Sequence, residues 1–190
     1  AATGGRAMND PVLLYAASAA LACVLLLGAL EKLKDMAAFA AAAQAYEIVP
    51  AALGGLFAWC YVLAEALAGA LLLTPGLRVP GALLALLVLA LASTGVAVNL
   101  ARGRRDIDCG CGGPAMRGAA ARGAGLSWWM VARNALLALW TLPVFAAAQG
   151  ASRSLQWADA ASVFGLAMSA VALYFTANHL LASHLKLRQL

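Results

Sequence analysis

Charged side chains are scarce in this sequence, and their scarcity argues against a soluble protein. Only 11% of the 190 residues are Asp, Glu, Lys or Arg, whereas 64% are hydrophobic and the mean hydropathy is +0.85. A soluble domain carries about 25% charged residues. Because so few polar groups cannot cover a water-exposed surface, we expect the lipid bilayer to be the solvent. The net charge of +5 does not indicate nucleic-acid binding, since no soluble basic face is present to carry it.

Cysteine and histidine are also rare, with four and two residues respectively. The cysteines are too few for a disulfide scaffold and fall into two groups. Cys23 and Cys60 lie in apolar runs, whereas Cys109 and Cys111 lie in a polar segment. The sequence has no His-Glu-x-x-His motif, no glycine-rich phosphate-binding loop and no credible Ser-His-Asp arrangement. These absences argue against a zinc protease, a nucleotide-phosphate site and a serine hydrolase.

Long apolar runs are what the sequence does contain. About 20 apolar residues in a helix cross the hydrocarbon of a bilayer, because each residue advances the helix by about 1.5 Å. The sequence therefore predicts an all-α fold, a polytopic membrane helix bundle of about five spans without a β-sheet. The expected spans are Pro11–Leu30, Ala51–Leu73, Pro80–Leu100, Ser127–Ala148 and Ala158–Leu181.

The segments outside these runs are short. We expect Glu31–Tyr46 to form a helix that lies at the membrane interface or folds back onto the bundle, because its start is too polar to span. Residues 1–10 are interpreted as an N-terminal tail, of which 1–7 are a cloning remnant without function. Residues 11–182 form the single membrane domain, and 183–190 form a C-terminal tail.

The sharpest chemical signal is Cys109-Gly110-Cys111, in the polar segment between the third and fourth expected spans. A disulfide across one intervening residue closes a small strained ring, and strain makes such a bond easier to reduce. This pattern favours thiol–disulfide exchange. Two alternatives remain: loop thiols without function, and capture of a soft metal such as Cu(I). We assign no metal site, because the segment has no histidine or third cysteine to complete a zinc site.

Five other residues within the apolar runs could carry chemistry. Cys23 and Cys60 are either small packing residues or a second thiol pair at comparable depth. Glu65 and Arg133 are costly inside hydrocarbon, so each should face the bundle and find a partner. Together with Asn134 they provide intramembrane polar support, either as helix-joining contacts or as part of a functional site. The sequence leaves open whether Glu65 and Arg133 pair directly.

A family resemblance follows from these residues. Three stretches carry it: Arg102-Gly-Arg-Arg-Asp-Ile-Asp-Cys-Gly-Cys-Gly-Gly-Pro114, Leu126-Ser-Trp-Trp and Arg133-Asn-Ala-Leu-Leu. They resemble the methylamine utilisation protein MauE family, which belongs with DoxX-like membrane proteins. Glu31-Lys-Leu-Lys-Asp, Tyr46, Pro50 and Glu65 are similar to that family's pattern as well. The resemblance implies a role in maturation of the disulfide-rich small subunit of methylamine dehydrogenase, together with a thioredoxin-like, MauD-like partner.

Two functions are therefore expected, and they belong to different classes. In the first, the protein is a membrane thiol–disulfide oxidoreductase in which Cys109 and Cys111 cycle, with electrons passing to the partner or to a membrane quinone. In the second, it is a non-catalytic docking or assembly factor for the partner and the subunit, and its cysteines are structural. The sequence does not decide whether the protein is an enzyme.

The expected topology conflicts with the redox interpretation. Five spans place nine Lys and Arg residues, and the Cys109 segment, on one face, against three on the other. Counting positive charges would put that face in the cytoplasm. Disulfide formation belongs in the periplasm, and the family's target lies there. We therefore favour the bacterial inner membrane with the cysteine segment facing the periplasm.

Overall fold

The computed structural model describes residues 10–107, 125–147 and 156–187, and every regular element in these ranges is helical. The predicted all-α fold is therefore confirmed. The elements are α2 (Pro11–Leu33), α3 (Met36–Ala45), the 3₁₀ turn η1 (Ala51–Leu53), α4 (Gly54–Leu73), α5 (Arg78–Ala101), α6 (Trp128–Leu139), α7 (Leu142–Ala147) and α8 (Trp157–Leu187).

Five helical segments are long and apolar enough to cross a membrane, as the sequence predicted. They are α2, α4, α5, the combined α6 and α7, and residues 159–178 of α8. Large apolar side chains such as Leu63, Leu87 and Phe164 are exposed on the outside of the bundle. This distribution is expected when lipid, rather than water, surrounds the helices. The chain is thus a multi-pass membrane protein.

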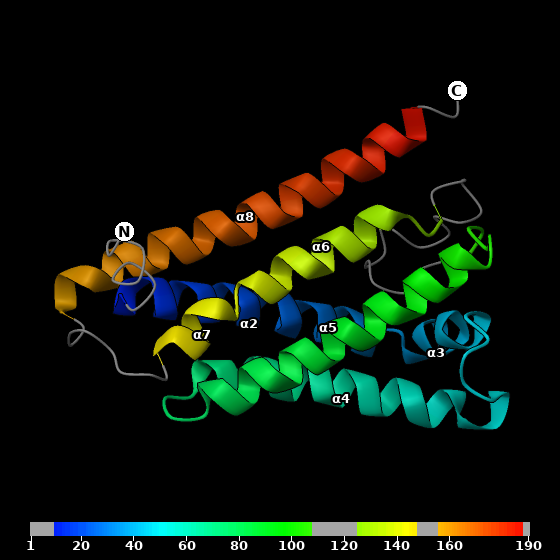
Figure 1. Ribbon diagram of the computed structural model, residues 1–190, viewed down its shortest axis with the longest axis horizontal. Coiled ribbons are helices and arrows are strands. Elements are labelled where there is room, and N and C mark those ends of the chain that lie inside the picture. The colour runs from blue at the N-terminus through cyan, green and yellow to red at the C-terminus, as the bar shows by residue number, and fades with distance from the viewer. Residues whose placement is uncertain (1–9, 108–124, 148–155, 188–190) are drawn as a thin grey trace.

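The helices lie side by side with α2 at the centre, where it packs against α4 and α8 (Figure 1). Helices α4 and α5 pair with each other, and α5 pairs with α6. The end of α2, the start of α4, the end of α5, the start of α6 and the end of α8 all lie at one end of the molecule (Figure 1). We call this the loop end. Because these helix ends lie together, the first and third connections begin and end on the same face as the end of α8, as the sequence predicted.

Helix α2 is longer than the apolar run that predicted it. Asp10 caps its start by accepting a hydrogen bond from the Val12 N–H (2.9 Å), and Pro11 occupies the first turn. The helix continues past Leu30 to Leu33, so Lys32 belongs to α2 and not to the following connection. Asp35 then caps α3. Helix α3 packs against α4, which confirms that this segment folds back onto the bundle.

The fourth span is interrupted, which the sequence analysis did not predict. Helix α6 ends at Leu139, and α7 begins at Leu142. Pro143 has no N–H to donate, and its ring would clash with a carbonyl one turn earlier in a continuous helix. The chain turns instead through Thr141, whose hydroxyl donates to the Ala138 carbonyl (2.7 Å).

Glycines permit the closest helix contacts. A Cβ on Gly81 would lie 2.8 Å from the Leu72 nitrogen, so α4 and α5 meet backbone to backbone near their connecting turn. A Cβ on Gly69 would lie 2.7 Å from the Leu26 side chain of α2. Small residues allow this approach in lipid, where packing rather than water exclusion holds helices together. The main core comes from α2, α4, α5, α6 and α7 and lies mostly away from the loop end. A cavity adjoins it on the side of the loop end, where Leu25, Leu89 and Leu137 belong to both.

Candidate functional site: a charged cavity within the bundle

A cavity of about 220 Å³ lies inside the bundle, between the main core and the loop end. Its walls come from α2, α3, α4, α5, α6 and α8, and most of them are apolar. Three ionisable side chains also line it: Lys32 from α2, Glu65 from α4 and Arg133 from α6. Two cations and one carboxylate give the lining a formal net charge of one positive unit.

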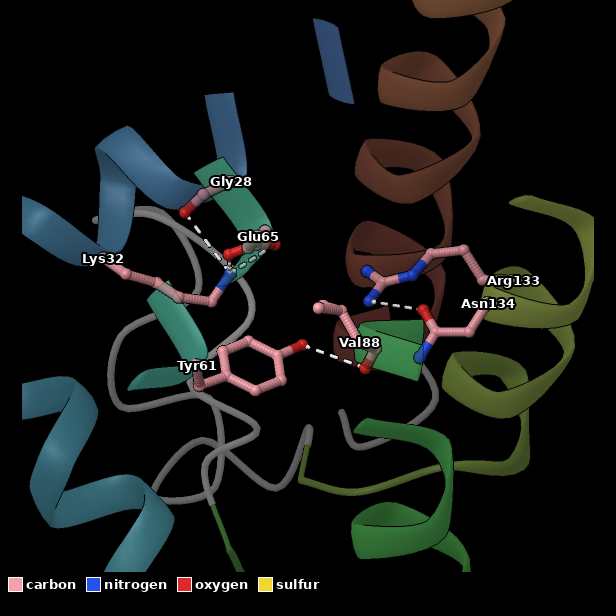
Figure 2. A network of polar contacts seen from close by, with 7 residues as sticks. All are labelled: Gly28, Lys32, Tyr61, Glu65, Val88, Arg133 and Asn134. Carbon is pink, nitrogen blue, oxygen red and sulfur yellow. Dashed lines mark hydrogen bonds and ion pairs between the residues drawn. The ribbon is translucent and has the colours of Figure 1, made fainter. Parts of the chain in front are cut away.

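Lys32 and Glu65 form a buried ion pair on one side of the cavity (Figure 2). The Lys32 ammonium donates to both Glu65 carboxylate oxygens, at 2.7 and 2.9 Å, and to the Gly28 carbonyl at 3.3 Å. Each side chain is only 8% exposed. A cation and a carboxylate inside hydrocarbon are each costly alone, so the pair allows both to stay charged. A Cβ on Gly28 would lie 3.0 Å from a Glu65 oxygen, which shows how closely α2 fits around the pair.

Aromatic rings surround the Lys32 ammonium. It lies 5.7 Å from the Phe39 ring centroid and 5.6 Å from that of Tyr61, so both rings contribute cation–π attraction. Phe57 extends this cluster with its ring centroid 6.1 Å from that of Tyr61. The Tyr61 hydroxyl donates to the Val88 carbonyl of α5 at 3.5 Å. These contacts explain why α3 folds back: it brings Phe39 over the charge.

Arg133 and Asn134 occupy the opposite side of the cavity, and Figure 2 shows the Arg133 guanidinium directed toward the space between them and the ion pair. Arg133 donates to the Asn134 and Asn178 side-chain oxygens, both at 3.5 Å, and it lies 6.0 Å from the Tyr174 ring centroid. Asn134 in turn donates to the Ser93 hydroxyl at 3.2 Å. This network joins α5, α6 and α8 at the height of the cavity.

The connection that carries the cysteines begins and returns at one fixed point beside the cavity. Gly103, with φ of 76°, ends α5, and the Arg104 N–H donates to the Asn99 carbonyl at 2.9 Å. The Leu126 N–H then donates to the Arg105 carbonyl at 2.8 Å. A Cβ on Gly125 would lie 1.8 Å from that same oxygen, so only glycine fits there.

A small apolar cluster anchors this point. Ile107 and Leu126, which flank the cysteine segment, are 7% and 3% exposed and pack with Met130 and Val96. Tyr46 packs against the same cluster. Met130, Val96 and Tyr46 also line the cavity, so the two features share a wall.

The predicted site residues have different outcomes. Cys109 and Cys111 lie outside the described residues. Cys23 and Cys60 are free and exposed on the bundle surface, so neither is the buried packing residue that we expected, and no disulfide joins them. Glu65 and Arg133 both face the bundle interior, and Asn134 lies beside Arg133.

The partner of Glu65 is Lys32, which the sequence analysis placed in a polar connection. One signal was available in the sequence. If the first helix continues one turn beyond Gly28, Lys32 lies on the same face as Gly28, and nothing at Leu30 requires the helix to end there. Asn178 was also missed as a partner of Arg133. Among the described residues, no group of three His, Cys, Asp or Glu side chains could hold a metal ion.

Fold and site together define a small multi-pass helical membrane protein with a charged cavity inside the bundle. Comparison with known families is more specific. The family model described as methylamine utilisation protein MauE matches residues 10–149. The chain therefore belongs to the MauE family, a family of methylamine utilisation proteins.

Three curated relatives, each named methylamine utilization protein MauE, agree with this assignment. The protein from Paracoccus versutus is 33% identical over 175 residues, which cover 92% of this chain and 90% of that protein. The one from Methylophilus methylotrophus is 38% identical over 104 residues, and the match covers 55% of each chain. The one from Paracoccus denitrificans is 28% identical over 135 residues, 71% of this chain and 69% of that protein. No solved structure matches the chain.

Proposed function

We propose that this protein is a membrane thiol–disulfide redox factor that supports disulfide formation in the small subunit of methylamine dehydrogenase. In this proposal Cys109 and Cys111 form the exchanging pair, and a thioredoxin-like, MauD-like protein is the partner. A thiolate of the partner attacks the Cys109–Cys111 disulfide and forms a mixed disulfide, releasing one thiolate of the pair. The partner's second thiolate then displaces the other, so the partner is oxidised and the pair is reduced.

The observation that supports the proposal most is the anchoring of the cysteine segment beside a charged cavity. Ile107 is buried in the cluster that shares Met130 with the cavity wall. Ile107 is the last described residue before the cysteine segment, two positions before Cys109 in the sequence. Family membership supports the methylamine context.

The second candidate is an assembly factor that docks the partner and the subunit without exchanging thiols. The observation that favours it is that the Lys32–Glu65 and Arg133 networks join α2, α4, α5, α6 and α8, as expected for structural support. Under this candidate the cysteines are structural and exchange no electrons with the partner.

Complementation of a strain that lacks the protein separates the two candidates. We expect Cys109→Ser and Cys111→Ser each to abolish the disulfides of the dehydrogenase small subunit, measured by thiol labelling of that subunit. Cys23→Ser and Cys60→Ser are the matched controls and should be milder, because both thiols are free and exposed on the bundle surface and do not pair with each other. Full function in the Cys109→Ser, Cys111→Ser double variant would leave the assembly factor as the only candidate.

We further propose that the protein resides in the inner membrane with the loop end facing the periplasm. Lys32 is buried in the ion pair, so it should not be counted among the charges that set topology. Without Lys32, the loop end still has more Lys and Arg residues than the opposite face. A membrane-impermeant thiol reagent applied to intact spheroplasts of a Cys23→Ser, Cys60→Ser variant should label the remaining cysteines after reduction. Labelling only after the membrane is opened would contradict this orientation.

A further inference from the structure

The cavity opens through the side of the bundle, at the depth of the bilayer hydrocarbon. Leu91 and Thr94 of α5 line the cavity and are exposed at the bundle surface. Ile48, also exposed, lies beside Gly95, where an added Cβ would be 3.9 Å from its side chain. Gly95 and Leu91 lie six and ten residues before Ala101, the end of α5, which is about 9 and 15 Å from the loop end. Since one leaflet contributes about 15 Å of hydrocarbon, the mouth of the cavity faces lipid tails.

The charged groups that line the cavity already have partners within the bundle. The Lys32 ammonium makes its three hydrogen bonds to Glu65 and Gly28. Arg133 and Asn134 belong to the network that joins α5, α6 and α8. A buried water needs about two to four polar partners, and these groups are already bonded to protein. An apolar occupant would leave all of these hydrogen bonds in place.

Most of the remaining wall is apolar, and it continues inward to the main core. Leu25, Leu89 and Leu137 belong to both the cavity and the core, and they are only 2%, 6% and 3% exposed. The volume of about 220 Å³ exceeds the roughly 150 Å³ of a dry protein cavity that binds benzene. The cavity is therefore an apolar recess with a mouth toward lipid and a closed end at these three leucines.

We propose that the recess holds an acyl chain of a bilayer phospholipid, which enters between Ile48 and Leu91 while its headgroup stays at the interface of the loop end. Moving a chain from lipid into protein releases no hydrophobic free energy, so packing drives its entry. The chain supplies dispersion contacts to a wall that would otherwise face a void. It also keeps water from the Lys32–Glu65 pair, and the attraction between two charges is stronger where water is absent.

Photolabelling of the full-length protein in phosphatidylcholine nanodiscs tests this proposal. The probe is a phosphatidylcholine with a diazirine near the end of one acyl chain, and labelled residues are identified by tandem mass spectrometry. Exposed residues such as Leu63 should be labelled by the surrounding lipid in any case. Leu25, Leu89 and Leu137 are buried, so label on them requires a chain inside the recess. Label confined to exposed residues would overturn the site.

A buried residue outside the recess controls for loosening of the bundle. Leu21 is completely buried in the same core and does not line the cavity. It should therefore remain unlabelled. Label on Leu21 equal to that on Leu25 would indicate general penetration by the probe and would overturn the site.

Two variants of α5 provide a matched comparison. Ala92 lines the cavity, whereas Ala90 is exposed outside it. Ala92→Phe should occupy the space of the chain and lower the labelling of the three buried leucines about tenfold, with Leu63 labelled as before. Ala90→Phe should be labelled as the unaltered protein is. Equal labelling of the buried leucines in the two variants would overturn the site, and the pattern in the unaltered protein tests it even if Ala92→Phe does not fold.

Two further arms identify the source of the chain and separate the site from thiol exchange. Palmitate carrying the same diazirine tests for a free fatty acid. Label on the buried leucines from palmitate, with none from the phosphatidylcholine, would contradict a phospholipid occupant. Occupancy does not require thiol exchange, so the Cys109→Ser, Cys111→Ser double variant should be labelled as the unaltered protein is, even where maturation fails. Loss of the label in that variant would contradict a recess built from α2, α5 and α6.

Discussion

Replacing Lys32 by methionine should destabilise the bundle more than any other single loss of a lysine. The ammonium makes its bonds of 2.7 and 2.9 Å to a carboxylate that is itself only 8% exposed. Lys32→Met leaves the buried Glu65 carboxyl without its ion-pair partner. Removing one partner of a buried pair costs about 3–5 kcal/mol. Placing an unpaired charge at the centre of a membrane helix costs about 3 kcal/mol on insertion scales. We therefore expect a loss of about 3 kcal/mol.

The matched control is Lys34→Met, two residues further on. Lys34 also forms an ion pair, with Glu31, but its side chain is 64% exposed. An exposed pair of this kind contributes at most about 0.5 kcal/mol, because solvent screens it. The assay is reversible unfolding of purified protein in mixed micelles with increasing sodium dodecyl sulfate, followed by circular dichroism. Lys32→Met should unfold at a clearly lower detergent fraction, and Lys34→Met should not.

A double variant refines the test. If the cost comes from an uncompensated charge, removing Glu65 as well should recover most of it. Lys32→Met, Glu65→Met should be within about 1–2 kcal/mol of the unaltered protein, since apolar replacement of a whole buried pair is often neutral. Unaltered stability in Lys32→Met alone, or a double variant less stable than the Lys32→Met single variant, would refute the reasoning.

Three other predictions concern close contacts and the polar network. In Gly125→Ala the new Cβ would lie 1.8 Å from the Arg105 carbonyl oxygen, so the hydrogen bond from the Leu126 N–H to that oxygen should be lost. Thiol exchange should then fall, while immunoblots show normal protein abundance. Gly28→Ala should cost about 1–3 kcal/mol by overpacking against the ion pair, whereas Gly55→Ala, with nothing within 4 Å, should be neutral in the same unfolding assay. Arg133→Lys keeps the charge but loses the planar fork, so membrane abundance should fall while the surviving protein still exchanges thiols.

The spans could be predicted from the sequence because lipid imposes a minimum apolar length on each crossing. All five runs are helical within a few residues of the expected bounds, the fourth as the two helices α6 and α7. The direction of each side chain could not be predicted in the same way. Helices such as α4 are apolar around most of their circumference, so no polar stripe marks the buried face. This explains why Cys23 and Cys60 were expected inside and lie outside.

The candidate site was predicted in part. Glu65, Arg133 and Asn134 were identified because polar and ionisable groups in hydrocarbon should face the bundle interior and find a partner there. Lys32 was missed because it follows the apolar run, and its burial depends on α3 folding back to place Phe39 over it. The break at Pro143 was missed because the apolar run continues through it, although its missing N–H was a usable signal.

Trapping the mixed disulfide tests the central claim most directly. Cys109→Ser and Cys111→Ser are each expressed with the thioredoxin-like partner. The one thiolate left in each variant can attack the partner's disulfide, which is the reverse of the last exchange step, and no second thiol of the pair remains to release the mixed disulfide. The account predicts that one of the two variants gives an adduct on a non-reducing gel. The adduct should disappear with reductant and should be absent when the partner's own cysteine pair is removed. No adduct from either variant, with both proteins present at normal levels, would contradict thiol exchange and indicate an assembly factor.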